Sequence, residues 1–97
     1  MLKKDILRRK DDFSSIYKKG KSIGERYIVL FYKRNGLSYN RIAFLASKKV
    51  GNSVKRNRAR RLMKESYRHL LKNGVIPDGP THYDFIMIAR NTISGKK

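Results

Sequence analysis

The segment from Ser47 to Lys72 reads SKKVGNSVKRNRARRLMKESYRHLLK, with basic and apolar residues interleaved at helical spacing directly after a glycine turn. Asn52 and Ser53 are residue types that favour a helix N-cap, and Asn73-Gly74 favours a helix end. Between these signals, residues suited to one buried face recur at i, i+3, i+4 spacing: Ala59, Leu62, Met63, Tyr67, Leu70 and Leu71. The segment therefore predicts a long amphipathic helix.

The opposite side of this helix is predicted to be a cationic strip. On a wheel of about 100° per residue, that side holds Asn57, Arg58, Arg61, Lys64 and Arg68, with Arg56 and Arg60 at its borders. A solvated face is the usual explanation of such charges, but a solvated face mixes signs, and Glu65 is the single acid of this segment. The planar guanidinium group suits bidentate contact with phosphate. The strip therefore favours a polyanion as partner.

The composition of the whole chain agrees with a polyanionic partner. The formal net charge is +18 over 97 residues, and the sequence pI is near 10.7. Such a charge predicts salt-sensitive association with nucleic acid or an anionic surface, and it does not distinguish RNA, DNA and lipid. With 39% hydrophobic residues, residues 1–97 are sufficient for the core of one small domain.

The sequence predicts a cytoplasmic protein with no membrane partner. No apolar run approaches the roughly 18 residues needed to span a bilayer, and the N-terminal MLKKDILRRKDDF lacks the apolar core of a signal peptide. There are no cysteines, which excludes a disulfide framework and thiolate metal sites.

The remaining elements are shorter. Lys10 to Lys19 predicts a helix, because Phe13, Ile16 and Tyr17 share one face and Gly20 ends it. Four further segments are predicted around the long helix: a short strand at 20–23, strands at 26–33 and 41–47 joined by a turn with Asn35-Gly36, and a last strand at 83–89 after a loop with Gly74, Pro77, Gly79 and Pro80. The turn suggests that strands 26–33 and 41–47 are antiparallel neighbours.

The predicted fold class is α+β, a sandwich with the order α-β-β-β-α-β and helices packed on a small mixed sheet. The strand from Tyr27 to Tyr32 is apolar or aromatic in both alternating sets. One face of this strand must be covered by the helices. The other is either covered by a further element or open as a platform on which aromatic rings stack with unpaired bases.

No catalytic residue and no metal site are expected in the protein itself. A nuclease needs convergent carboxylates or histidines, and the acids here are scattered: Asp5, Asp11, Asp12, Glu25, Glu65, Asp78 and Asp84. Asp11 and Asp12 are placed to favour the N-terminus of the first helix, and His69 the last turns of the long one. His82 falls in a loop, and Ser53 lacks a base partner and is interpreted as a helix cap.

Two linked stretches resemble a known family. They are Ser47-Lys48-Lys49-Val50-Gly51-Asn52-Ser53-Val54 and Arg56-Asn57-Arg58-Ala59-Arg60-Arg61-Leu62-Met63-Lys64. Together they closely resemble the signature of the bacterial ribonuclease P protein subunit, with Ser53 in place of alanine as the mildest departure. The similarity extends to Phe13, Ile16, Tyr17 and the turn at 18–20, and to the segment 84–90, so it covers nearly the whole chain.

This resemblance implies a function in which the protein does not cut the phosphodiester. The RNA subunit does so with bound magnesium, while the protein binds the catalytic RNA and the 5′ leader of precursor tRNA. Carried over by position, the catalytic RNA would contact Lys48, Lys49, Lys55, Arg56, Asn57, Arg58, Arg60, Arg61, Lys64 and Arg68. The leader-binding cleft would comprise Phe13, Ile16, Tyr17, Phe31 and Lys49.

The resemblance also implies a left-handed β-α-β crossover, against the general handedness rule. The family continues after residues 89–91 into a third helix that this chain lacks, which predicts uncovered apolar surface near Phe44, Ile86 or Ile88. Anions such as sulfate or phosphate are expected to stabilise so basic a fold. The alternative is a non-catalytic RNA-binding structural protein such as a ribosomal protein, with which size, charge and fold class agree equally well.

Overall fold

The computed structural model describes residues 6–74 and 80–90. In chain order it contains α1 (Lys10–Lys19), β1 (Lys21–Gly24), β2 (Ile28–Arg34), β3 (Arg41–Leu45), the short 3₁₀ helix η2 (Lys48–Val50), α2 (Ser53–Lys72) and β4 (Tyr83–Ala89). This confirms the predicted α-β-β-β-α-β order and the bounds of α1 and β4. None of the helices in this part of the chain has the length and apolarity to cross a membrane. Several predictions fall outside the described residues, namely those on Asp5, Pro77, Asp78, Gly79 and the segment 91–97.

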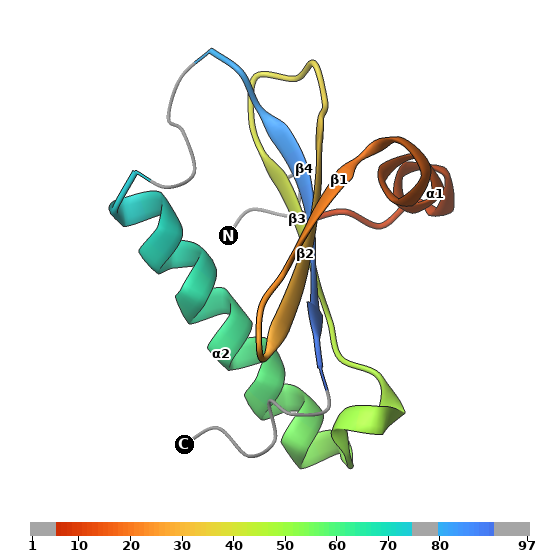
Figure 1. Ribbon diagram of the computed structural model, residues 1–97, viewed down its shortest axis with the longest axis vertical. Helices are drawn as coiled ribbons and strands as arrows, with labels where there is room; N and C mark the ends of the chain where they lie inside the picture. The colour runs from red at the N-terminus through yellow and green to blue at the C-terminus, as the bar shows by residue number, and fades with distance from the viewer. Residues whose placement is uncertain (1–5, 75–79, 91–97) are drawn as a thin grey trace.

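The described strands form one mixed sheet in the order β1-β2-β4-β3 (Figure 1). Strand β2 is antiparallel to both β1 and β4, and β4 is parallel to β3. The prediction that strands 26–33 and 41–47 are neighbours is therefore wrong, because β4 lies between them. The residues from Asp84 to Met87 are all buried, so β4 gains more from a central place than it would at an edge. The left hand of the β3-α2-β4 connection stays a prediction.

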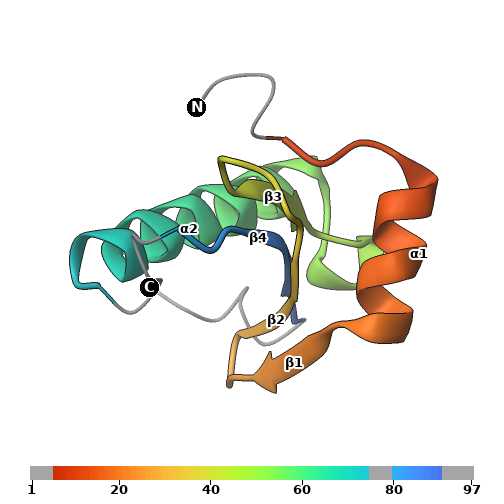
Figure 2. The same ribbon diagram turned by 90° about the horizontal axis from the view of Figure 1, so that it is seen from above.

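The two helices cover opposite faces of this sheet (Figures 1 and 2). Beneath α1 the buried cluster is Leu7, Ile16, Ala43 and Ile86, with Phe13, Phe31, Leu45 and Ile88 packed against it. Beneath α2 the buried cluster is Ile42, Val50, Ala59, Met63, Tyr67, Phe85, Met87 and Ala89. Each of the two apolar faces of β2 thus faces one of the helices.

The residues near which uncovered apolar surface is expected, Phe44, Ile86 and Ile88, are themselves covered in part or in full. Ile86 is completely buried beneath α1, and Phe44 and Ile88 are half-buried. The ring of Phe44 packs edge-on against Tyr67 of α2, with 6.0 Å between ring centroids. The two helices therefore cover Ile86 completely and Phe44 and Ile88 in part.

Helix α2 confirms most of the predicted periodicity. Its N-cap is Asn52, whose Oδ1 accepts a hydrogen bond from the backbone N–H of Lys55 at 3.0 Å. Ser53 is the first residue of the helix and not its cap. Of the predicted inner face, Ala59, Met63 and Tyr67 are buried, and Leu62 and Leu70 are half-buried. Leu71 is 40% exposed, because it lies about 100° beyond Leu70 and turns away from the sheet.

Helix α1 ends in close contact with β2 at Gly20. A Cβ atom at this position would lie 2.5 Å from the carbonyl oxygen of Ile16 and 2.7 Å from that of Tyr32. Only a residue without a side chain allows this approach. Before α1, the N–H of Leu7 donates to the carbonyl oxygen of Ile42 in β3 at 3.0 Å. The helix is therefore attached to the sheet at both of its ends.

Candidate RNA interface

The lead-in to α2 is built so that two lysines face solvent. The Oγ of Ser47 accepts a hydrogen bond from the N–H of Lys49 at 3.3 Å, and Val50 is buried under α2. Gly51 has φ of +139°, a backbone conformation that favours glycine. Lys48 and Lys49 are exposed as a result. They lie next to the N-terminus of α2, where the helix dipole adds to their attraction for phosphate.

The cationic strip on α2 is present as predicted. All ten residues predicted to contact the catalytic RNA lie on η2 and α2, and none is buried. Arg56 and Arg60 are half-buried, as expected of border positions. Arg56 Nη1 donates to the carbonyl oxygen of Gly51 at 3.3 Å, and Arg60 Nη1 donates to Asn57 Oδ1 at 3.0 Å. These bonds hold two guanidinium groups in place at the margin of the strip.

Three cations of the strip are not neutralised by an ion pair within the described part of the chain. Among the described residues, no ion pair joins Arg61, Lys64 or Arg68 to an acid. Like charges at helical spacing repel one another, so this face gains free energy when a polyanion approaches it. The arrangement suits a phosphate backbone that follows the helix for several turns.

The three rings of the predicted leader-binding cleft lie on the other face of the sheet, on α1 and β2. The rings of Tyr17 and Phe31 pack edge-to-face with 5.0 Å between centroids and 86° between planes. Phe13 and Phe31 are half-buried, and Tyr17 is 44% exposed. Partial burial raises the pKa of the Tyr17 phenol, so this ring stays neutral at physiological pH. Rings that are partly open can stack on unpaired bases.

The other two predicted cleft residues are placed differently. Ile16 is 1% exposed and belongs to the core, so it can only support the rings from below. Lys49 is exposed on η2, which projects on the same side of the sheet as α1 (Figures 1 and 2). The lead-in at Ser47–Gly51 thus connects the side of the cleft to the beginning of the strip.

A buried ion pair holds α1 against the sheet. It is not predicted from the sequence. Asp84 of β4 is 5% exposed, and its two carboxylate oxygens accept from Arg41 Nε at 2.8 Å and from Arg41 Nη2 at 2.6 Å. Asn35 Nδ2 donates to Asp84 Oδ1 at 3.0 Å, and Arg41 Nη1 reaches Asp12 Oδ2 of α1 at 3.3 Å. The hydrogen bonds to Asp84 raise the pKa of Arg41, so its charge is permanent. Asp12 therefore does more than favour the helix dipole.

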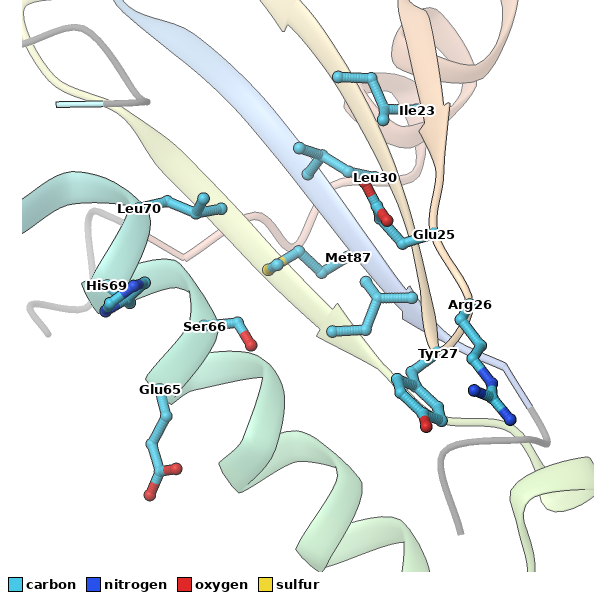
Figure 3. Close-up of a pocket in the computed structure, with 11 residues that line it drawn as sticks. Ile23, Glu25, Arg26, Tyr27, Leu30, Glu65, Ser66, His69, Leu70 and Met87 are labelled. Atoms are coloured by element: carbon cyan, nitrogen blue, oxygen red, sulfur yellow. The ribbon is translucent and has the colours of Figure 1, made fainter. Parts of the chain in front are cut away.

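An open groove of about 740 Å³ separates α2 from β1 and β2 (Figure 3). Apolar side chains make up its floor and walls, among them Ile23, Leu30, Leu70 and Met87. Glu25, Arg26 and Glu65 also line it, so the groove has no excess of positive charge that would attract a phosphate backbone. Uncovered apolar surface thus exists on the α2 side of the sheet, beside Met87, which is opposite Phe44 and lies between Ile86 and Ile88 in the chain. Within 6–74 and 80–90, no cluster of three or more histidine and acidic side chains could hold a metal ion.

The family model for ribonuclease P matches residues 1–97. The chain belongs to the ribonuclease P protein family. The family role, which is tRNA 5′ leader processing together with an RNA subunit, applies to this chain, so this match favours the ribonuclease P hypothesis over the ribosomal-protein alternative.

Individual ribonuclease P proteins show the extent of the similarity. The protein component from Alkaliphilus oremlandii is 45% identical over 86 residues, which cover 89% of this chain and 71% of that protein. The Staphylococcus aureus RNase P protein structure superposes with a TM-score of 0.78 at 30% identity, covering 96% of this chain and 81% of that one. The Thermotoga maritima RNase P protein gives a TM-score of 0.73 at 34% identity, covering 93% of this chain and 77% of that one.

Proposed function

We propose that this chain binds the catalytic RNA of ribonuclease P through the α2 strip and its lead-in, while the RNA subunit cuts the precursor tRNA with bound magnesium. The observation that carries this proposal is the strip itself, a helix face on which Arg61, Lys64 and Arg68 form no ion pair with a described acid. The chain that bears it is matched by the family model over residues 1–97. A cationic protein placed between two RNA molecules lowers the repulsion between their phosphates. The place of action that these partners imply is the bacterial cytoplasm.

The α1 side of the sheet is the proposed contact for the 5′ leader. The half-open rings of Phe13, Tyr17 and Phe31 offer stacking surfaces, and Ile16 would form the floor beneath them. Lys49 would contact a leader phosphate from η2. Stacking on aromatic side chains tolerates any base, which suits a leader whose sequence differs between precursor tRNAs.

Replacing Tyr17 by alanine tests the leader contact. Base–aromatic stacking contributes about 1–3 kcal/mol per base, so we expect the Tyr17→Ala complex to bind precursor tRNA about tenfold more weakly. The measurement is the dissociation constant of the complex for precursor tRNA, with mature tRNA without a leader as the matched control. Mature tRNA should bind the variant and parent complexes equally. An equal loss for both RNAs would show that Tyr17 does not contact the leader.

Sulfate should stabilise the isolated protein. The net charge of +18 destabilises the compact state by self-repulsion, and an anion that binds only the folded state offsets it. With a dissociation constant of about 5 mM, 50 mM sulfate would add about 1.4 kcal/mol, or roughly 5 °C or more in melting temperature. The control is sodium chloride at equal ionic strength. Equal shifts in the two salts would reduce the effect to general screening.

A further inference from the structure

A second group of cations and rings lies at the end of the sheet where β1 and β4 begin and β2 ends, the upper end in Figure 1. Lys21 of β1 is directly opposite Tyr32 of β2, and Arg34 of β2 is directly opposite Tyr83 of β4. Opposed residues of antiparallel strands share a face, as do residues two apart along one strand. The four side chains therefore form one contiguous group, called here the β-end patch.

The β-end patch is on the α2 side of the sheet. Tyr32 and Tyr83 both pack against the cluster beneath α2, and their rings meet edge-on with 6.2 Å between centroids. The rings of Tyr17 and Phe31 lie on the α1 side. The N-terminus of α2, with its lead-in, lies at the lower end of Figure 1. The patch thus lies on the opposite face of the sheet from the rings of Tyr17 and Phe31, and at the opposite end of the sheet from the lead-in to α2.

The patch surrounds a hollow of about 400 Å³, lined also by Lys19, Gly20 and Lys33. The close contact of Gly20 with the backbone of Tyr32 brings the end of α1 against β2, so Lys19 and Lys21 flank this point. Among the described residues, four cations and no carboxylate line the hollow. Asp84, opposite Lys33, points to the other face and is held by Arg41.

Ordinary structural roles explain only part of this charge. Lys19 is in the last turn of α1, where a cation favours the helix dipole, and Lys33 Nζ donates to Ser15 Oγ at 2.8 Å. A lysine such as Lys21 on an edge strand also discourages pairing with other chains. Arg34 has neither role, because it is exposed at the end of an inner strand, and no ion pair engages it among the described residues.

We propose that the β-end patch is a second RNA-binding site, in which Lys21 and Arg34 contact backbone phosphates and Tyr32 and Tyr83 contact the sugar or base between them. Alternation of cation and ring matches the alternation of phosphate and base along an RNA strand. A free phosphate or a lipid headgroup would need the cations alone. The proposal rests on the proposed function, because the RNA is either the catalytic RNA or the precursor tRNA.

The test compares the double variant Lys21→Gln/Arg34→Gln with the matched control Lys10→Gln/Lys72→Gln, which loses the same charge at two other exposed positions. One arm measures binding of the chain to the catalytic RNA. The other measures binding of precursor tRNA to the assembled complex. We expect at least a tenfold loss in one arm, and the slope of log affinity against log salt should fall by about 1.4 for two single-strand phosphates.

The arm in which the glutamine variant binds more weakly identifies which of the two RNAs contacts the β-end patch. The charge-preserving variant Lys21→Arg/Arg34→Lys should bind within a fewfold of the parent, which separates contact with phosphate from disturbance of the sheet. If the parent chain binds both RNAs and the glutamine variant matches the control in both arms, the β-end patch is not an RNA site and the proposed function stands. If the parent chain binds neither RNA, both proposals are overturned.

Discussion

Replacing Arg60 and Arg61 by glutamine is expected to weaken binding of the chain to the catalytic RNA by about two orders of magnitude. Arg61 is exposed on the strip, and Arg60 is held at its margin by the bond to Asn57. A hydrogen bond to a charged group contributes about 1.5 kcal/mol or more, so two phosphate contacts sum to about 3 kcal/mol, and every 1.4 kcal/mol is tenfold.

The measurement is the dissociation constant for the catalytic RNA over a range of salt concentrations. The double variant Lys10→Gln/Lys72→Gln is again the control, since it removes the same charge elsewhere on the surface. The slope against log salt should fall by about 0.7–0.9 for each phosphate contact that is lost. If the Arg60→Gln/Arg61→Gln chain binds the catalytic RNA as tightly as the control does, the α2 strip is not part of the RNA interface.

Replacing Asp84 by alanine should cost about 3 kcal/mol of folding stability, a large part of the roughly 5–15 kcal/mol typical of a small domain. The Arg41 side chain is 21% exposed, so the variant leaves a largely buried guanidinium without its bidentate partner. The bond from Asn35 to Asp84 is lost as well. Because Arg41 also reaches Asp12, the position of α1 over the sheet should loosen.

Urea denaturation measures this effect as a change in the free energy of unfolding. Asp11→Ala is the matched control, because Asp11 is an exposed carboxylate in the same turn of α1 as Asp12. The double variant Arg41→Met/Asp84→Leu should recover part of the loss, since removing both charges leaves neither one buried alone. A loss below about 1 kcal/mol in Asp84→Ala would show that the pair is not important for stability.

The helix boundaries are predicted well from the sequence, because they depend on local patterns. The helix α1 ends at Gly20 and α2 begins after Asn52, and both follow from short-range signals read along the chain. The pairing of strands 26–33 and 41–47 could not be predicted in this way. Asn35-Gly36 suggests a hairpin, yet six residues separate β2 from β3, and β4 from far along the chain takes the place between them.

The binding surfaces differ in the same way: a surface on one helix can be predicted from the sequence, whereas a surface built from several strands cannot. The α2 strip lies on one helix, so a helical wheel is sufficient to place Arg61, Lys64 and Arg68 on one side. The β-end patch joins residues from three strands, and its composition depends on the register of β1, β2 and β4. Local patterns along a single sequence do not reveal that strand register. The bond between Arg41 and Asp84 is missed for the same reason, although an acid inside an apolar strand is a usable signal.

Reconstitution with a catalytic RNA tests whether this chain acts as the protein subunit of ribonuclease P. The chain is added to a bacterial ribonuclease P RNA at low magnesium, and cleavage of a precursor tRNA with a 5′ leader is followed, with circular dichroism in sulfate to establish that the protein is folded. We predict cleavage at the mature 5′ end that is faster than with RNA alone and absent with protein alone. A folded chain that gives no stimulation, or that cuts the precursor without the RNA, would contradict this account.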